Sequence, residues 1–445
     1  MADRVRLNST VGNLCDEGVL LTQTGPFGSQ LHSHDYVPRG IPVIPTEAIG
    51  RRRLVTDGIP EVSEETASRL RRHRLKAGDI LFARRGVQAT GLSALVTPKQ
   101  EGWLCGTGAI LLRVTGPGVD PEFLSFFLSA NETVLWLKQH AVGAVMPNLN
   151  ESVIRRLPLT LPTLPEQKAI ATVLATLDDK IELNRRMNAT LEAMARVLFQ
   201  SWCIDFDPVR AKLDGRQSPG LDPATAALFP DSFKDSELGH IPQGWSVQSL
   251  GQMAGYLNRG IGPAYVEAKG ILVLNQKCIR DHRVNWQLAR RHDATKKSVV
   301  GREVMKLDIL VNSTGVGTLG RVAQVLELPE SAIVDSHITI VRARKDIDPY
   351  FLGQNLTIRE DEVEALGEGS TGQTELSRGR LGALRFVTPT YQLQKAFGAI
   401  VEPLFERIAA SQKQSAQLNA VRDTLLPKLL SGELHFGDYA KEVAA

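Results

Sequence analysis

Two short motifs contain residue types that can bind a cofactor or a metal ion. Gly315-Val-Gly-Thr-Leu-Gly320 matches the GxGxxG pattern of dinucleotide sites, in which a helix must follow so that its N-terminus can hold the pyrophosphate. The next residues, Arg321-Val-Ala-Gln-Val-Leu326, are typical of a strand, so the motif predicts a hairpin turn. His32-Ser-His34-Asp35 could belong to a metal site, but no further His or Cys cluster accompanies it, which predicts a polar loop.

Other sequence motifs for catalysis are missing. The chain has no GxxxxGK[ST] loop, with which a nucleotide-driven motor holds phosphates. It has no (Asn/Asp/Ser)-Pro-Pro-(Tyr/Phe) run, with which an amino-methyltransferase holds a flipped base. The four cysteines show no CxxC spacing, which excludes a zinc ribbon and a disulfide scaffold and indicates reduced thiols. We therefore predict no catalytic residue, no metal site and no cofactor on this chain.

Charge is nearly balanced over the 445 residues, with 52 Lys and Arg against 49 Asp and Glu. This balance excludes a wholly basic protein, but it leaves room for local basic surfaces. Between Arg51 and Arg85, ten Lys or Arg stand against five acidic residues, and between Lys277 and Lys306 nine stand against three. Two basic windows at matching places in the chain favour nucleic-acid binding, because Lys and Arg neutralise phosphates.

Polar residues near these windows are candidates for reading bases, since Arg recognises guanine and Asn or Gln recognises adenine. The DNA-binding candidates of the first window and its surroundings are Gln23, Ser29, Gln30, Arg51, Arg52, Arg53, Arg71, Arg72, Arg74, Lys76, Arg84 and Arg85. Those of the second are Asn275, Gln276, Lys277, Arg280, Arg283, Arg290, Arg291, Lys296, Lys297, Asn312 and Ser313.

The chain repeats itself with a period of about 227–230 residues, which is half its length. Leu75-Lys-Ala-Gly-Asp-Ile-Leu81 parallels Val304-Met-Lys-Leu-Asp-Ile-Leu310, and Asp120-Pro-Glu-Phe-Leu124 parallels Asp348-Pro-Tyr-Phe-Leu352. A period of this length predicts two similar domains and not a solenoid. Apolar runs predict strands at residues 80–82, 109–114, 309–311 and 338–341, and short helices are expected at residues 120–129 and 348–356.

A long heptad pattern follows each domain and predicts two helices that pair as a coiled coil. Both patterns are polar at the same two central positions, which tends to fix register. The alternative is that each helix packs only on its own domain. Pro403 should kink the second helix or break its first turns. The seam residues are Ile170, Leu174, Leu177, Ile181, Asn184, Asn188, Leu191 and Leu198 in the first helix, and Val401, Leu404, Ile408, Ser411, Ser415, Leu418 and Leu425 in the second.

Taken together, an ordered set of passages resembles the specificity subunit of a type I restriction–modification system (HsdS-like) over nearly the whole chain. The passages are Gln23-Thr-Gly-Pro-Phe-Gly-Ser-Gln-Leu31, Gly78-Asp-Ile-Leu-Phe-Ala-Arg-Arg-Gly86 with its counterpart Asp308-Ile-Leu-Val-Asn-Ser-Thr-Gly-Val-Gly317, Leu164-Pro-Glu-Gln-Lys-Ala-Ile170, Ser201-Trp-Cys-Ile-Asp-Phe-Asp-Pro-Val209, Glu237-Leu-Gly-His-Ile-Pro-Gln-Gly-Trp245 and Leu429-Leu-Ser-Gly-Glu-Leu434. One departure concerns the second helix, which begins with Tyr391-Gln-Leu-Gln-Lys395 where the family has Pro-x-x-x-Glu-Gln, seen here as Pro162-Thr-Leu-Pro-Glu-Gln167.

The resemblance implies a mixed α/β fold with two target-recognition domains, joined by two long helices that form an antiparallel coiled coil. The implied organisation is target-recognition domain 1 at residues 1–163, conserved helix 1 at 164–204, a Pro/Gly-rich linker at 205–240, target-recognition domain 2 at 241–390, conserved helix 2 at 391–434 and a tail at 435–445.

The resemblance also implies a non-catalytic function. Each domain would read one half of a bipartite double-stranded DNA site, and the helices would set the gap. Two modification subunits would dock on the helices and carry S-adenosylmethionine and the adenine methyltransferase chemistry, while restriction subunits, where present, would use ATP and Mg²⁺. Such a system defends a prokaryotic cytoplasm against phage. No signal peptide or stretch of about 18 apolar residues is present, so no membrane contact is expected.

Two other functions are open at this point. A coiled-coil scaffold without DNA contact would share the paired helices but not the salt-sensitive binding that phosphate neutralisation produces. An NAD-linked enzyme would use Gly315 to Gly320 and would need a helix after them.

Overall fold

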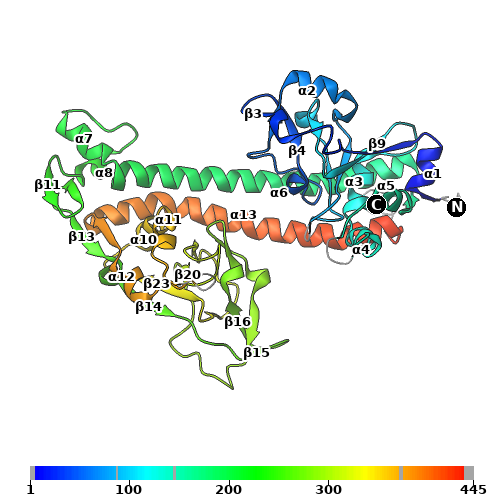
Figure 1. Ribbon diagram of the computed structural model, residues 1–445. Coiled ribbons are helices and arrows are strands. Elements are labelled where there is room, and N and C mark those ends of the chain that lie inside the picture. The colour runs from blue at the N-terminus through cyan, green and yellow to red at the C-terminus, as the bar shows by residue number, and fades with distance from the viewer. Residues whose placement is uncertain (1–5, 87–88, 144–146, 370–373, 435–445) are drawn as a thin grey trace, which may run out of the picture. The chain divides into compact units, whose positions relative to one another are not determined.

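The fold is given by a computed structural model that describes residues 6–86, 89–143, 147–369 and 374–434. It separates into two compact units (Figure 1). Unit 1 comprises Met1–Glu182 and Ser415–Ala445, and unit 2 comprises Leu183–Gln414. Each unit therefore contains one α/β domain and a portion of both long helices. The finer boundaries of the target-recognition domains, the linker and the tail stay predictions.

Unit 1 contains ten strands and five complete α-helices among its described residues. In chain order they are β1 (Leu7–Thr10), α1 (Val11–Asp16), β2 (Leu20–Thr24), β3 (Tyr36–Val37), β4 (Ile41–Ile44), β5 (Glu61–Val62), α2 (Glu64–Arg69), β6 (Ile80–Ala83), β7 (Ser93–Leu95), β8 (Leu104–Cys105), β9 (Ala109–Val114), α3 (Pro121–Ser129), α4 (Asn131–His140), α5 (Glu151–Arg155) and β10 (Pro158–Leu161). Short 3-10 helices lie at Ser33–Asp35, Thr46–Ala48, Arg71–His73 and Pro98–Gln100.

Unit 2 repeats this plan with additional short elements. They are α7 (Asp207–Leu213), α8 (Pro223–Ala227), β11 (Phe233–Ser236), β12 (Gly239–Pro242), β13 (Ser246–Ser249), α9 (Leu250–Met253), β14 (Ala254–Arg259), β15 (Tyr265–Val266), β16 (Ile271–Leu274), β17 (Ile279–Arg280), β18 (Arg283–Val284), β19 (Arg290–His292), β20 (Ile309–Asn312), β21 (Val322–Gln324), β22 (Ala332–Val334), β23 (Ile338–Ala343), α10 (Pro349–Thr357), α11 (Glu360–Ala365), α12 (Arg378–Ala383) and β24 (Arg385–Thr388). The 3-10 helices are Gln276–Cys278 and Trp286–Leu288.

The sheets of the two units have the same topology, which confirms the internal repeat. The antiparallel sheet β2-β9-β6-β7 of unit 1 corresponds to β14-β23-β20-β21 of unit 2. The mixed sheet β3-β5-β4-β8 corresponds to β15-β19-β16-β22, and each contains one parallel pair, β4 with β8 or β16 with β22. A mixed α/β fold with two similar domains is therefore correct.

The sequence-predicted strands and short helices are all present. The apolar runs form β6, β9, β20 and β23, which are fully or mostly buried. The short helices begin after Asp120 and Asp348, whose carboxylates each accept hydrogen bonds from two backbone N–H groups of the first turn. A proline follows each of these caps, and proline suits the first helical position because its missing N–H would have no partner there.

The hairpin predicted for Gly315 to Gly320 is confirmed. β20 and β21 pair antiparallel on either side of these residues, with Ile309 opposite Gln324. No helix follows Gly320, so the N-terminal anion site that a dinucleotide needs is not formed there. The predicted polar loop at His32 to Asp35 is a short 3-10 helix whose His32 and His34 side chains are exposed.

The long helices are α6 (Leu164–Phe199), which continues as a π-helix (Gln200–Ile204), and α13 (Tyr391–Ser431). In unit 1, Ile170 and Leu174 near the start of α6 share a core with Leu426 near the end of α13. In unit 2, Phe199 at the end of α6 packs on Phe397 near the start of α13. The helices therefore pair antiparallel within each unit, as the resemblance implied.

Pro403 does not break α13, so that part of the prediction is wrong. The helix is continuous through this residue. Proline removes the hydrogen bond to the carbonyl four residues earlier, which is that of Ala399. Both Pro403 and Ala399 lie on the exposed side of the helix, where water can satisfy the carbonyl.

The start of α13 departs from the family pattern in sequence but not in structure. Gln167 Nε2 donates to the Pro162 carbonyl at 2.8 Å before α6, and Gln394 Nε2 donates to the Pro389 carbonyl at 2.9 Å before α13. Both glutamines are buried. The proline and the glutamine are the parts of the pattern that fix the helix start, and both are kept.

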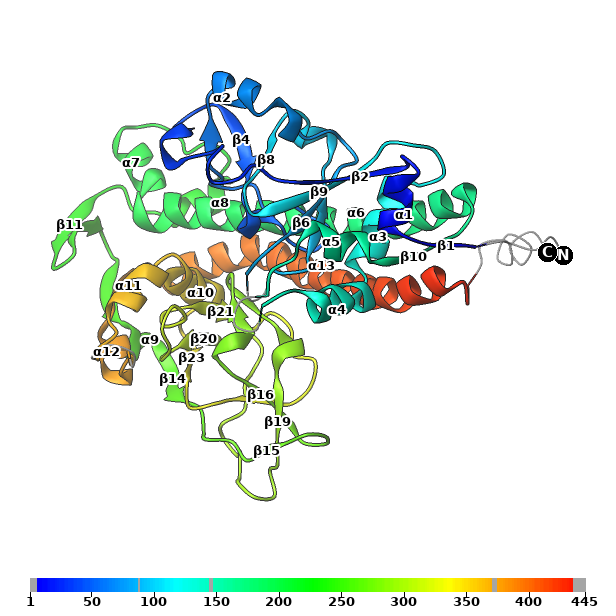
Figure 2. The same cartoon turned by 45° about the vertical axis from the view of Figure 1, so that its right-hand side comes forward.

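The Pro/Gly-rich stretch after α6 is more ordered than a linker. It forms α7, α8, β11 and β12, and its Phe206, Val209 and Phe229 belong to the main core of unit 2. Figure 2 shows β11 and α7 beyond the end of α6. The apolar residues between its turns bury their side chains and fold the segment onto the unit.

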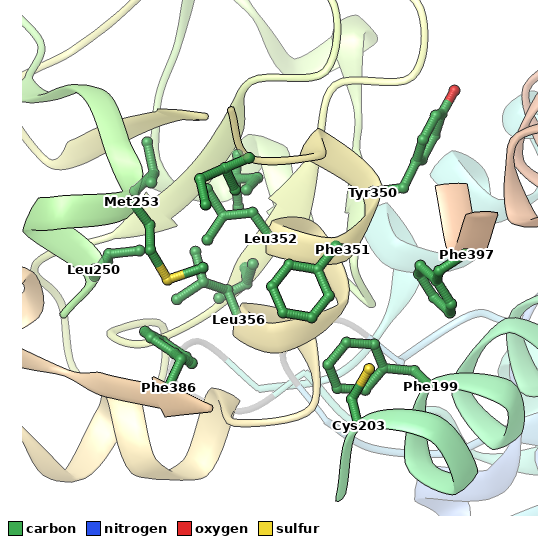
Figure 3. Packing of buried hydrophobic residues seen from close by; sticks show 14 of the residues in the cluster. Phe199, Cys203, Leu250, Met253, Tyr350, Phe351, Leu352, Leu356, Phe386 and Phe397 are labelled. Carbon is green, nitrogen blue, oxygen red and sulfur yellow. The ribbon is translucent and has the colours of Figure 1, made fainter. Parts of the chain in front are cut away.

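The main core of unit 2 is aromatic where its helices meet. Phe199 of α6 lies 5.7 Å from Phe351 of α10 and 5.6 Å from Phe397 of α13, measured between ring centres. Figure 3 shows these rings together, with Leu352 and Leu356 of α10 turned towards the domain. All of these side chains are buried. Helix α10 therefore joins the sheet domain to the helix pair within the unit.

Candidate nucleic-acid interface

Arg52 of the first basic window is buried against both long helices. Its Nε lies 3.1 Å from Asp178 Oδ2 of α6, and its guanidinium carbon lies 3.2 Å from the centre of the Phe126 ring. Arg422 of α13 binds the other oxygen of Asp178 at 2.8 Å. Burial lowers the pKa of Arg52, and the carboxylate of Asp178 opposes this change. The arrangement argues against Arg52 as a DNA contact, because its side chain is only 13% exposed and its charge is compensated.

Arg51 and Arg53 are also occupied by contacts within the protein. Arg51 donates to the Ser129 carbonyl and to Asn131 Oδ1, each at 2.6 Å. Arg53 pairs with Glu182 of α6 and donates to the Asp178 carbonyl at 2.9 Å. These three arginines fix a domain loop to helices, so their charge density in the sequence is explained without DNA.

Other candidates of the first window face solvent or support a loop. Ser29, Arg71, Arg72 and Lys76 are exposed, and Gln30 is half-buried. Arg74 pairs with Glu64. On the segment between α2 and β6, the candidates that remain open to a phosphate are therefore Arg71, Arg72 and Lys76.

Gln23 supports that segment from inside. Its Nε2 donates to the Arg72 carbonyl at 3.0 Å and lies 2.9 Å from His73 Nδ1. Burial lowers the pKa of the His73 imidazole to about 4, and the Arg72 guanidinium acts in the same direction. The ring is therefore neutral at pH 7, which suits an acceptor for the Gln23 amide.

The second window is divided between paired and open cations. Arg283 binds Glu192 of α6 at 2.9 Å, Arg291 binds Glu330 at 2.7 Å, and the Arg290 guanidinium lies 3.4 Å from the Tyr265 ring centre. The exposed cations are Lys277, Arg280, Arg290, Lys296, Lys297, Arg302 and Lys306. Of these, Lys297 donates to the Gly262 carbonyl at 2.8 Å.

Asn312 and Ser313 are fully buried, which argues against direct base contact by either side chain. Asn312 Nδ2 donates to the Gln276 carbonyl at 3.0 Å, and Ser313 Oγ lies 2.6 Å from Thr339 Oγ1. Asn275 caps a 3-10 helix by accepting from the Lys277 N–H. Asn312 and Asn275 therefore hold the backbone on either side of the Gln276 side chain in place.

A polar corner forms in unit 2 where β16 and β20 end and β23 begins. Thr314 Oγ1 lies 2.7 Å from His337 Nδ1 and donates to Gln276 Oε1 at 3.4 Å. The Ser313 N–H donates to the His337 carbonyl at 2.8 Å, and the Asp335 N–H donates to the Leu274 carbonyl at 2.9 Å. Three loops are thereby locked around one group of polar side chains.

Unit 1 has the equivalent corner, where β4 and β6 end and β9 begins. The Arg84 N–H donates to the Gly108 carbonyl at 3.0 Å, and the Gly106 N–H donates to the Ile44 carbonyl at 3.0 Å. Arg84 Nε donates to Asn148 Oδ1 at 3.0 Å, and Arg85 is exposed. Arg84 and Arg85 are thus the candidates of the first window that lie at this corner.

The seam residues are buried or half-buried throughout, including the central polar ones. Asn184, Asn188 and Ser411 are at most 3% exposed. Asn184 Nδ2 donates to Gln414 Oε1 at 2.9 Å and to the Ser411 carbonyl at 3.4 Å. Ile170, Leu174, Val401 and Ile408 are buried, and Leu177, Ile181, Leu191, Leu198, Leu404, Ser415, Leu418 and Leu425 are half-buried.

The thiols have no nucleophilic setting. Burial raises the pKa of Cys105 to about 12 and also raises that of Cys203, so both stay protonated at pH 7. Among the residues that the structure describes, no three His, Cys, Asp or Glu side chains gather as a metal site would require. Within the same residues, no helix is both long and apolar enough to pass through a bilayer.

Sequence reasoning missed Thr314 and His337, which the structure brings to Gln276. Both lie outside the basic windows that guided the choice of candidates. The signal that could have found them is the repeat, since Thr314 occupies the place of Arg85 and His337 that of Gly108. Asp178 was missed because the heptad pattern selects apolar positions such as Leu177, and it gives no weight to a charged residue next to one of them.

Comparisons with known proteins show what this chain resembles. Residues 33–193 match the family described as "Type I restriction modification DNA specificity domain". The HindI specificity subunit of Haemophilus influenzae is 25% identical over 407 residues, covering 81% of this chain and 87% of the relative. The MjaIX specificity subunit of Methanocaldococcus jannaschii is 27% identical over 325 residues, covering 71% and 70%. The crystal structure of a type I restriction–modification S subunit from M. genitalium covers 96% of this chain and 97% of its own, with a TM-score of 0.56 and 15% identity.

Proposed function

Because the chain belongs to the family of type I restriction–modification specificity subunits, we propose that each of its two domains reads one half of a bipartite double-stranded DNA site. The observation that carries this proposal is the repeated domain, which is the same in topology in both units but differs in its exposed polar side chains. Two copies of one domain with different surfaces suit a site with two different halves. DNA sequence recognition is thus the role of the chain.

The helices α6 and α13 set the gap between the half-sites in this proposal and dock the modification subunits. Support for docking comes from α6 within unit 2, where Leu183, Met194 and Val197 are 57%, 52% and 67% exposed. An apolar row on an already paired helix suits a further protein helix better than water. The adaptor without DNA contact is not favoured, since the matched family is a DNA specificity domain.

The chemistry lies on other subunits in this proposal. Two modification subunits bind S-adenosylmethionine and methylate adenine, and restriction subunits, where present, bind ATP and Mg²⁺. The assembly works in a prokaryotic cytoplasm. This chain contributes the sequence and the spacing at which those activities occur.

We expect the full-length chain, assembled with its modification subunits, to protect one split DNA sequence in footprinting. The same sequence should carry the methyl groups when the genome is sequenced for modified bases. Because phosphate contacts release counterions, affinity should fall by about 10³–10⁵ between 50 and 200 mM salt if six to ten phosphates are bound. Modification subunits without this chain are the control. Protection of no split sequence, or binding that ignores salt, would contradict the proposal.

Shortening both helices by one heptad should shorten the gap between the half-sites. Removal of residues 184–190 and 411–417 takes equivalent segments from the two helices, because the repeat relates these positions. Seven residues of helix are about 10 Å long, which corresponds to about three base pairs. Methylated motifs of the shortened protein should show this change. A variant whose seven residues are exchanged for another heptad of equal length should keep the original gap, and an unchanged gap in the shortened protein would contradict the spacer role.

A further inference from the structure

We propose that the bases are read at the equivalent polar corner of each domain. In unit 2 this base-reading corner consists of Gln276, Thr314 and His337, and in unit 1 of Arg84 and Arg85. The inference rests on the proposed function and deepens it, because it assigns side chains to the half-sites. It also assigns a base to each corner: adenine in one half-site and guanine in the other.

The backbone of the two corners is the same. The strand end that carries Arg84 binds the loop at Gly108, and the strand end that carries Ser313 binds the loop at His337 in the same way. The next contact is also shared, since the Leu149 N–H donates to the Arg84 carbonyl and the Leu376 N–H donates to the Ser313 carbonyl, both at 2.8 Å. Equivalent positions can therefore be compared one by one.

A glycine closes each corner. After β2, a Cβ on Gly25 would lie 1.9 Å from the Gly106 carbonyl oxygen, and after β14 a Cβ on Gly260 would lie 2.0 Å from the Val334 carbonyl oxygen. Only glycine permits this approach of one chain to another. The frame that holds the corner is thus built the same way in both domains.

The side chains on this frame are different, although polar contacts elsewhere are retained. Away from the corner, Arg113 binds Asp79 in unit 1 and Arg342 binds Asp308 in unit 2, each through two hydrogen bonds of 2.6–2.7 Å. At the corner, Arg85 corresponds to Thr314. Thr46 corresponds to Gln276, and Gly108 to His337. Contacts that the fold needs are kept, whereas side chains that read two different half-sites must differ.

The unit 2 corner is preorganised for an adenine. Thr314 donates to Gln276 Oε1, and Asn312 donates to the Gln276 carbonyl. Thr314 is itself held by His337. A glutamine amide supplies one donor and one acceptor, which match N7 and the N6 amino group of adenine in the major groove. A fixed amide loses little conformational entropy when it binds, so its contact discriminates well.

Two cations of the second window lie beside the loop that follows β14, whose Gly260 packs against the backbone at Val334. The Arg302 guanidinium donates to the Arg259 carbonyl, and Lys297 donates to the Gly262 carbonyl, so both side chains lie beside the loop that follows β14. Arg259 itself binds Glu375 and the Leu376 carbonyl. Phosphate contacts of this kind position a protein on the duplex, and the polar side chains between them specify the base.

The unit 1 corner presents arginine at the same place. Arg85 is exposed, and Arg84 is oriented by Asn148. Guanidinium groups bind O6 and N7 of guanine through two parallel hydrogen bonds, which is the commonest specific contact to a base. We therefore assign a guanine to the half-site that unit 1 reads.

The test is a selection of random duplex DNA by the full-length chain assembled with its modification subunits. The wild-type protein should enrich a split sequence. Gln276→Glu should lose its preference for adenine at one position by about 10- to 100-fold and shift it towards cytosine, because a carboxylate accepts from the cytosine N4 amino group. Arg85→Gln should lose a guanine preference of similar size in the other half-site. Thr314→Val, which removes only the hydroxyl that holds Gln276, should weaken the same adenine preference.

Gln287→Glu and Arg39→Gln are the matched controls, because each makes the same change of charge at an exposed residue of the same unit. Both should keep the wild-type sequence. Enrichment of no split sequence by the wild type would refute the proposed function itself. A wild-type split sequence that all three corner variants retain would overturn the base-reading corner alone, as would Gln276→Glu and Arg85→Gln variants that alter the same half-site.

Discussion

Replacement of Asp178 by alanine is expected to destabilise unit 1 by about 3–5 kcal/mol. Asp178 is 10% exposed and lies between the guanidinium groups of Arg52 and Arg422, which are 13% and 23% exposed. Without the carboxylate, the two guanidinium groups stay close together and keep only the more exposed Glu122 and Asp423 as partners, at 3.7 and 2.8 Å. Removing one partner of a buried ion pair costs more than the pair contributes, because the remaining charge is left uncompensated.

Urea unfolding of the full chain, followed by hydrogen exchange in peptides of unit 1, measures this change. Asp179→Ala is the matched control, since Asp179 is the exposed neighbour on the same helix and should change the free energy of unfolding by less than about 0.5 kcal/mol. Equal stability of the two variants would mean that the ion pairs of Asp178 with Arg52 and Arg422 do not hold the domain loop to the helices.

The second repeat solves the same packing problem with aromatic rings. In the repeat, Phe405 is the equivalent of Asp178, and Tyr350 is the equivalent of Glu122. Glu122 also lies near Arg52, at 3.7 Å. Tyr350 and Phe405 stack with ring centres 5.6 Å apart. At these two equivalent positions, one domain therefore contacts its helix by charge and the other by apolar contact.

Much of the fold could be predicted because its signals are local. Apolar runs gave β6 and β20, and an Asp-Pro pair marked the start of each short helix. Sheet order could not be predicted, because β2 pairs with β9 nearly ninety residues away and no local sequence pattern indicates which strand it pairs with. The segment after α6 was taken for a linker because its turns are local, whereas the burial of Phe206 depends on a distant core.

The candidate site was predictable only in part, because charge in a sequence does not show which way a side chain faces. Arg52 and Arg85 belong to one basic window, yet the first is buried against Asp178 and the second is exposed. Gln276 became a candidate because its amide lies beside the second basic window, and its contact with DNA stays a prediction. Its partner Thr314 is 38 residues further along the chain, and His337, which contacts Thr314, is 61 residues further; only the folded sheet brings them together.

Truncation of Phe397 to alanine should destabilise unit 2 by about 3–5 kcal/mol, which is the range for a fully buried phenylalanine. Its ring is 1% exposed and contacts Phe199 and Trp202 with ring centres 5.6 and 6.1 Å away. The cost combines the apolar surface lost with the cavity that remains, and the two neighbouring rings cannot easily close that cavity. Hydrogen exchange in peptides of unit 2 during urea unfolding reports the change.

Ile400→Ala on the same helix is the control for this variant. Ile400 is 40% exposed, so its truncation should cost far less than that of Phe397. Because Phe199 belongs to α6 and Phe397 to α13, the loss should lower protection in both helices of unit 2 together. If only α13 lost protection, the two helices would be stabilised independently, and the antiparallel pair could not act as one spacer between the half-sites.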